Sequence, residues 1–111
     1  MIVVTTRVPV AAAREDEYQV RLFDRLGLLE RHPGFVRLEV LRPAPVLLAG
    51  VPVGHSDSYV VLTYWETAAH FAAWTEDDDF SRAHARRAAS DHFSGAIPFE
   101  VHEVIQSSAG A

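Results

Sequence analysis

The hydrophobic and polar positions along the chain follow two periods, one typical of strands and one typical of helices. Four segments alternate with a period of two and are rich in β-branched and aromatic residues: residues 2–9, 35–42, 58–65 and 97–105. Between the first two, residues 11–31 carry an apolar stripe at helical spacing: Tyr18, Leu22, Leu26 and Leu29. The pattern therefore predicts four strands and a long helix after the first of them.

The second helical region is predicted to consist of two pieces. Thr67 has the character of an N-cap for a short helix over residues 68–75, and Asp77 or Asp78 caps a second helix over 79–91. The element order is then β-α-β-β-α-β with a split second helix. This order favours a ferredoxin-like α+β fold, in which helices cover one face of a four-stranded antiparallel sheet.

The 111 residues suit a single domain over 1–111, with 106–111 as a frayed tail. The predicted strands carry apolar residues on both faces. In residues 35–42, for example, one face is Val36, Leu38 and Val40, and the other is Phe35, Arg37, Glu39 and Leu41. We therefore expect the second sheet face to be buried as well, by a homodimer that stacks two sheets into a barrel.

The connection over residues 43–57, PAPVLLAGVPVGHSD, has an apolar tip between prolines and glycines. An exposed apolar connection in a small acidic domain needs cover. Two interpretations stay open at this point. The loop folds back onto its own core, or it packs on a second subunit or closes over a pocket.

Composition narrows the classes of function. The formal net charge is −5, all ten basic residues are arginine, and cysteine is absent. This excludes thiolate and lysine chemistry, and an acidic chain with no basic block is a poor nucleic-acid binder. No apolar run approaches the ~18 residues of a membrane span, and the N-terminus lacks a signal-peptide pattern. We expect a cytoplasmic protein without nucleic-acid or membrane partners.

Candidate chemistry concentrates in residues 70–87, HFAAWTEDDDFSRAHARR. Phe71 and Trp74 lie one helical turn apart, and Phe80 and His84 share a face of the next predicted helix. Ordinary core packing explains each aromatic residue alone, and a structural hydrogen bond explains the histidine. The alternative is that Trp74 and His84 are two walls of one pocket.

No other histidine belongs to a metal-binding pattern. The HExxH motif is absent, and four histidines are expected in turns, loops or on solvent faces: His32, His55, His70 and His102. His92 shares a predicted helical face with His84 and is a candidate second imidazole of the pocket. The acidic run at 77–79 is expected to cap a helix as a solvated turn.

Several short motifs together resemble the antibiotic biosynthesis monooxygenase superfamily of dimeric α+β barrels. They are HPGF at 32–35, LTYWET at 62–67, FAAW at 71–74 and FSRAH at 80–84. The resemblance covers nearly the whole chain, and its weakest part is the 43–57 connection, which is longer and more apolar than usual. Within the superfamily, the ten-residue spacing from tryptophan to histidine is most similar to bacterial heme-degrading monooxygenases.

That resemblance implies a role for each residue of the candidate site. His84 would ligate heme iron, which is the one metal expected, and Trp74 would press on the porphyrin, with Phe71 and Phe80 lining the site. Arg87, or its neighbour Arg86, would pair with a propionate. An external electron donor would be required.

One residue departs from the heme-degrading pattern. Those proteins carry a first-strand asparagine where TTRV places Thr6, and a hydroxyl cannot reproduce the donors and acceptor of an amide. The departure bears on oxidative activity more than on heme binding.

Two other functions stay open. One is a cofactor-free monooxygenase acting on a polycyclic phenol or quinol, with Trp74 and Tyr64 stacking on the substrate and His84 or an arginine stabilising its anion. The other is a non-catalytic dimer of the same fold, in which Trp74 and His84 only pack.

Overall fold

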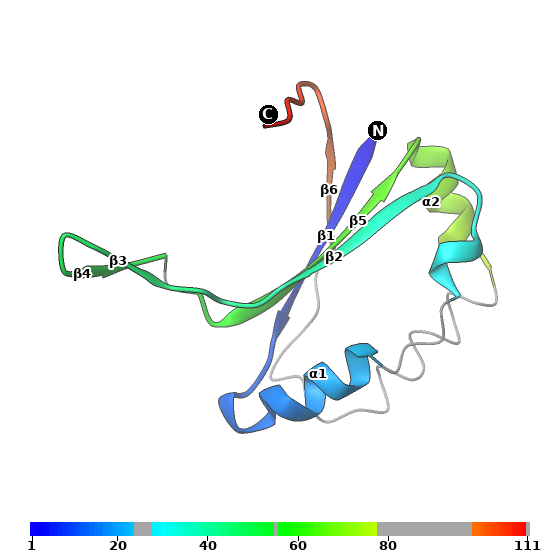
Figure 1. The fold of residues 1–111 in the computed structure, drawn as a ribbon. Helices are drawn as coiled ribbons and strands as arrows, with labels where there is room; N and C mark the ends of the chain where they lie inside the picture. The colour runs from blue at the N-terminus through cyan, green and yellow to red at the C-terminus, as the bar shows by residue number, and fades with distance from the viewer. Residues whose placement is uncertain (24–27, 55, 78–98, 111) are drawn as a thin grey trace.

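The fold is built on one antiparallel sheet of four strands in the order β2-β5-β1-β6 (Figure 1). The computed structural model describes residues 1–23, 28–54, 56–77 and 99–110. Its sheet strands are β1 (Ile2–Pro9), β2 (Phe35–Leu41), β5 (Ser58–Trp65) and β6 (Phe99–Glu103). Every neighbouring pair is antiparallel, so the ferredoxin-like α+β prediction is confirmed for the described elements.

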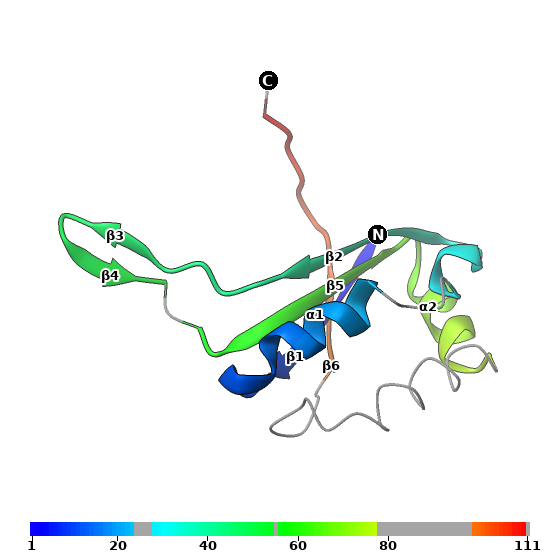
Figure 2. The ribbon, with the colours of Figure 1, turned by 60° about the horizontal axis from the view of Figure 1, so that its bottom comes forward.

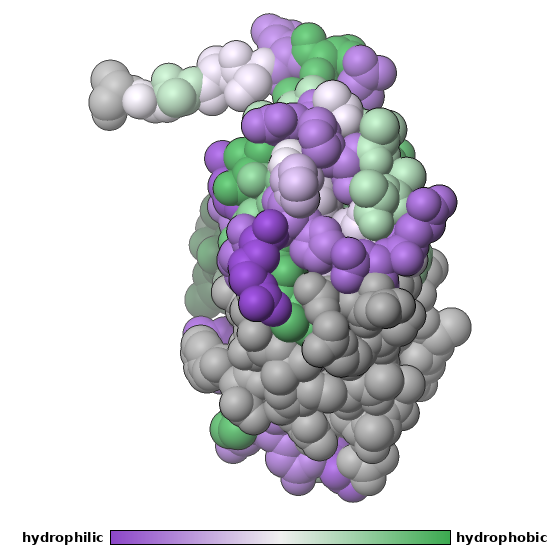
Figure 3. Space-filling model, turned by 90° about the vertical axis from the view of Figure 1, so that its right-hand side faces the viewer, coloured by the Kyte–Doolittle hydropathy of each residue, from purple (hydrophilic) through white to green (hydrophobic). Residues whose placement is uncertain are grey.

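Two α-helices, α1 (Glu15–Phe23) and α2 (Ala68–Thr75), lie on one side of this sheet. In Figure 2 they lie below and in front of the sheet, whereas the C-terminal segment after β6 leaves it in the opposite direction. Figure 3 shows the same segment projecting from the body. The sheet therefore has a helix-covered face and an open face.

The burial pattern of β1 shows where the core lies. Ile2, Val4, Thr6 and Val8 are buried, whereas the alternate positions are partly or fully exposed. Because successive side chains of a strand point to opposite faces, these four residues form one row under the helices. The hydrophobic core divides along this row into a cluster around Trp65 and Trp74 and another around Val8 and Tyr59.

A β-bulge in β2 changes the predicted faces of that strand. The register shifts between Phe35 and Arg37, and Phe35 pairs with Trp65, whose ring lies 5.6 Å away edge-on. The prediction that Phe35 shares a face with Arg37 was wrong. A bulge places two residues of one strand opposite one of its partner, so simple alternation fails across it.

The 43–57 connection contains a hairpin and is not simply a loop. β3 (Val46–Leu48) pairs antiparallel with β4 (Val51–Val53) as a separate two-stranded sheet. The sequence pattern predicted a loop here because of the prolines, since proline is rare inside paired strands.

The long helix predicted over 11–31 is replaced by shorter elements. A 3-10 turn at Ala12–Arg14 precedes α1, and Leu29–Arg31 is a second 3-10 turn. The first half of the split second helix is confirmed as α2. Its predicted cap is confirmed too, because the Thr67 hydroxyl oxygen accepts a hydrogen bond from the His70 backbone N–H. The predicted helix at 79–91 lies outside the described residues.

The HPGF turn is shaped by its glycine. Gly34 has φ +82° and lies directly against the His70 ring. Any side chain would collide with α2, so this glycine allows the turn before β2 to pack against the helix.

Candidate functional site

Trp74 is held on the helix-covered face at one end of the sheet. It is 6% exposed and packs with Ile2, Val4 and Leu28. Its ring stacks on that of Trp65, with centroids 6.5 Å apart and planes inclined by 27°. The indole is therefore a rigid wall, because tertiary packing fixes it on one side.

Phe71, one turn earlier on α2, contributes to the same wall. Its ring centroid lies 5.8 Å from that of the fully buried Trp65, and the side chain is partly buried against the core. Phe71 and Trp74, one helical turn apart on α2, therefore pack against the same core cluster.

His32 also belongs to this region, although the sequence pattern placed it on a turn or a solvent face. Its ring meets the Trp74 ring edge-on, with centroids 4.5 Å apart. Its Nε2 lies 3.9 Å from Asp77 Oδ1, and the side chain is only 13% exposed. His32 lies in the turn before β2, as predicted, and this turn folds under the end of α2 so that the side chain is mostly buried.

Thr6 lies further along the same face, between the two core clusters. It is the only buried polar residue among those described, at 5% exposed. Thr6 is the next residue after Val4 on this face of β1, about 7 Å further along the strand. No hydrogen bond of the Thr6 side chain occurs within the described part of the chain, so its hydroxyl can serve a ligand.

Phe99 is a candidate that sequence reasoning missed. It pairs with Thr6 across β1 and β6, on the same face, yet it is 49% exposed. The period-two pattern predicts the strand of Phe99 but not the residue that it pairs with, because register between distant strands is a tertiary property. The largely buried Thr6 therefore lies beside the accessible aromatic ring of Phe99.

Three predicted site residues, Phe80, His84 and Arg87, lie outside the described residues, as does Arg86. Their roles remain predictions. Among the residues that the structure describes, no group of three or more metal-ligating side chains is present. In that same part of the chain, no helix is long and apolar enough to span a membrane.

Tyr64 does not belong to this site. It follows the alternation of β5 onto the open face, where its hydroxyl donates to Glu39 Oε1 at 2.9 Å and its ring lies 4.0 Å from the Arg37 guanidinium. Tyr64 and Trp74 are on opposite sides of the sheet. The expectation that they stack together on one substrate was wrong for a single chain.

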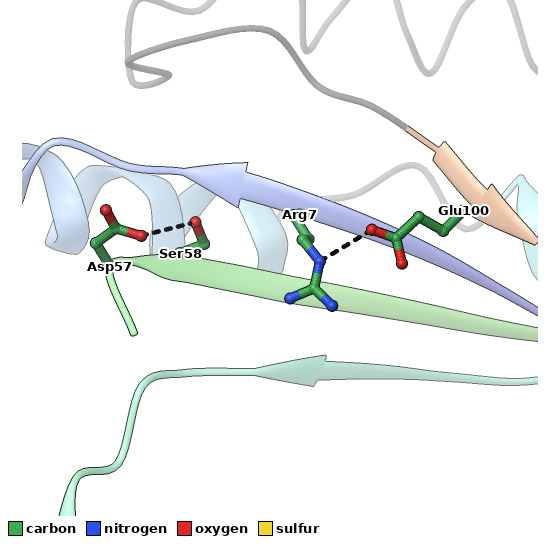
Figure 4. A network of polar contacts seen from close by, with 4 residues as sticks. All are labelled: Arg7, Asp57, Ser58 and Glu100. Atoms are coloured by element: carbon green, nitrogen blue, oxygen red, sulfur yellow. Dashed lines mark hydrogen bonds and ion pairs between the residues drawn. The ribbon is translucent and has the colours of Figure 1, made fainter. Parts of the chain in front are cut away.

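The open face mixes apolar and paired charged groups. Arg7 on β1 bonds Glu100 on β6 at 3.1 Å (Figure 4). Between the charged side chains, the alternation of β1 and β5 leaves Val3, Val60 and Leu62 half-buried. This face is apolar enough to be covered, and its charges already have partners within the chain.

Comparisons with known proteins agree with this architecture. The model of the antibiotic biosynthesis monooxygenase family matches residues 1–86. A protein of Shouchella clausii named heme-degrading monooxygenase is 32% identical over 108 residues, which is 96% of this chain and 94% of that protein.

Two solved structures extend the comparison. The heme degrader MhuD of Mycobacterium tuberculosis, with two hemes bound in its active site, superposes with a TM-score of 0.77 at 27% identity, over 98% of this chain and all of that one. SnoaB of Streptomyces nogalater, a cofactor-independent oxygenase, superposes with a TM-score of 0.70 over 96% of this chain and 94% of that one. At 20% identity, SnoaB supports the fold alone.

Proposed function

The chain belongs to the antibiotic biosynthesis monooxygenase family, and we propose that it binds heme and degrades it oxidatively. The observation that carries this proposal is the likeness, over 96% of the chain, to a relative named heme-degrading monooxygenase. MhuD, which has a similar fold, holds hemes in its active site.

The described side chains suit a porphyrin. Ligand sites for large apolar molecules are mostly aromatic and aliphatic, with a few placed polar groups. The covered face offers the Trp74 wall, the accessible ring of Phe99 and the hydroxyl of Thr6. These residues are of the types that would line a porphyrin site, with Thr6 able to offer a hydrogen bond.

Each residue has a distinct part in the proposed site. Bound heme would itself supply the redox chemistry towards O2, with electrons from an external donor. Trp74 would press on the ring plane, and Thr6 would donate one hydrogen bond. His84 would ligate the iron and Arg87 would bind a propionate, as the sequence resemblance implies.

We also propose that two copies of the chain stack through their open sheet faces. The half-buried apolar row of Val3, Val60 and Leu62 supports this, because it lies between the charged pairs of the same face. A twofold dimer would use the same patch on both copies. Cytoplasmic location remains a prediction, which cell fractionation tests.

Hemin titration tests the heme proposal. We expect saturable binding with a Soret shift, lost in His84→Ala and retained in the control His102→Ala, whose side chain is exposed on the open face. Reductant in air should then bleach the Soret band in a protein-dependent way. The proposal fails if micromolar hemin produces no Soret shift with the wild-type protein.

A second measurement separates a ligand wall from simple core packing. Trp74→Ala should lower the free energy of unfolding by about 3–5 kcal/mol, as large core truncations do. If Trp74 contacts heme, Trp74→Phe should also reduce the stabilisation that added hemin gives. An unchanged hemin-linked stabilisation in Trp74→Phe would instead favour a packing role.

A further inference from the structure

The β3–β4 ribbon and its flanks, residues 43–54, form an arm that stands away from the body (Figures 1 and 2). Among the described residues, β3 and β4 pair only with each other. Four large apolar side chains of the arm are more than half exposed: Val46 53%, Leu47 70%, Leu48 60% and Val51 59%. An isolated two-stranded ribbon is marginally stable in water, so such an apolar arm needs cover.

The arm has a defined shape. Its two-residue turn has φ +51° at Ala49 and φ +80° at Gly50, the signs of a type I′ turn, which matches the twist of a hairpin. A positive φ at alanine carries a backbone energy cost. The chain adopts the tight hairpin turn in spite of this cost. A defined ribbon can present its side chains in a fixed arrangement.

The arm is suited to side-chain docking rather than to strand addition. Pro52, opposite Leu47 in β4, has no N–H to give to a further strand. Proline on an edge strand is a common barrier to edge-to-edge pairing. The leucine and valine side chains are therefore the contact surface.

The position of the arm identifies its occupant. It continues β2 and β5, the strands that carry Leu41, Val60 and Leu62 on the open face. Residues 43–54 contain no charged side chain, and the chain has net charge −5 and no lysine. Anionic lipid would repel such a protein, whereas a second copy stacked on the open face would bring an apolar surface to the arm.

We propose that the arm packs its leucine and valine side chains against the body of a second copy of this chain. The proposal rests on the dimer proposed above and adds a contact beyond the stacked sheets. By twofold symmetry, each copy would clasp the other with its own arm.

Because the wild-type chain lacks cysteine, single-cysteine variants can be spin-labelled cleanly. We expect the label of Leu47→Cys to be immobilised at dimer concentrations and to become mobile on dilution into monomer. The control is Val20→Cys on α1, whose native side chain is similarly exposed at 65%. Its label should stay mobile throughout.

Sedimentation equilibrium gives the matching energetic test. Leu47→Glu with Leu48→Glu should raise the dimer dissociation constant by about tenfold or more, since two apolar contacts are replaced by desolvated charges. Val20→Glu should change it by less than about twofold. Ala49→Asn, which makes a favoured Asn-Gly turn and keeps the apolar side chains, should not weaken the dimer.

Four results would overturn the proposal. They are a mobile label at position 47 in a proven dimer, an immobilised label in a monomer, immobilisation only after adding phosphatidylcholine–phosphatidylglycerol vesicles, or a monomeric wild type. Hemin titration of the same samples separates this failure from failure of the heme proposal, because Soret binding does not depend on the arm's mobility.

Discussion

The two faces of the sheet are built from alternate residues of the same strands, yet they differ in burial and in the contacts that their side chains make. On the covered face Trp65 is fully buried and in contact with aromatic rings. On the open face its neighbour Tyr64 hydrogen-bonds to an exposed glutamate. The covered face holds most of the buried core and carries the proposed ligand wall, whereas the open face and the arm expose apolar side chains that the proposed dimer would cover.

Truncating neighbouring aromatic residues of β5 tests this contrast most strongly. Trp65→Ala should lower the free energy of unfolding by about 3–5 kcal/mol, because it empties a filled core site. Tyr64→Ala, one residue away, should cost less than about 1.5 kcal/mol in the monomer. Urea denaturation at low protein concentration measures both, and equal losses would contradict the division of the faces.

His32 offers a smaller test of the covered face. His32→Ala removes the edge-on ring contact with Trp74 and the approach to Asp77. We expect a loss of about 1 kcal/mol, the size of a single aromatic contact. Thermal denaturation followed by tryptophan fluorescence, to which Trp65 and Trp74 both contribute, should show the change. The control Val20→Ala on the exposed side of α1 should alter stability by less than about 0.5 kcal/mol and leave the emission unaltered.

Thr6 tests whether the polar group on the covered face serves folding or a ligand. Thr6→Val keeps the shape of this buried residue and removes its hydroxyl, which makes no side-chain hydrogen bond within the described residues. The free energy of unfolding should stay within about 1 kcal/mol of wild type or rise, while the rate of heme degradation should fall. A clear loss of stability with an unchanged rate would assign Thr6 to the fold.

The ion pair on the open face should have the smallest effect. Glu100→Gln removes the negative charge of the ion pair with Arg7 and leaves an amide oxygen that can still accept from it, and both side chains are about half exposed. We expect a change of roughly 0–1 kcal/mol that shrinks with added salt. Denaturation at low and high ionic strength checks this, and a large salt-independent loss would mean that the face is buried in the assembly.

Local pattern predicted the strands well where alternation was regular. In β1 it placed Ile2, Val4 and Val8 on one face, and all three are buried. It failed at Phe35, because a bulge adds a residue that alternation cannot count. It also missed the hairpin, because an Ala49-Gly50 turn lacks the usual asparagine or aspartate signal.

The candidate site was predictable only in part. Phe71 and Trp74 follow from helical spacing and a Thr67 cap, and the structure confirms that they share the covered face. His32 and Phe99 reach the site from turns and strands far away in the sequence. No local signal marks them, because their roles depend on packing and register.

The sequence by itself determined the four strands of the main sheet, the short helix α2, an acidic composition without cysteine and the family resemblance, because these depend on residue identity and short-range periodicity. Tertiary structure decided which side of the sheet each residue faces, that Tyr64 and Trp74 lie apart, and that the 43–57 connection forms a projecting arm. Strand register and helix placement arise from long-range packing, and a single shift of register moves a side chain from one face to the other.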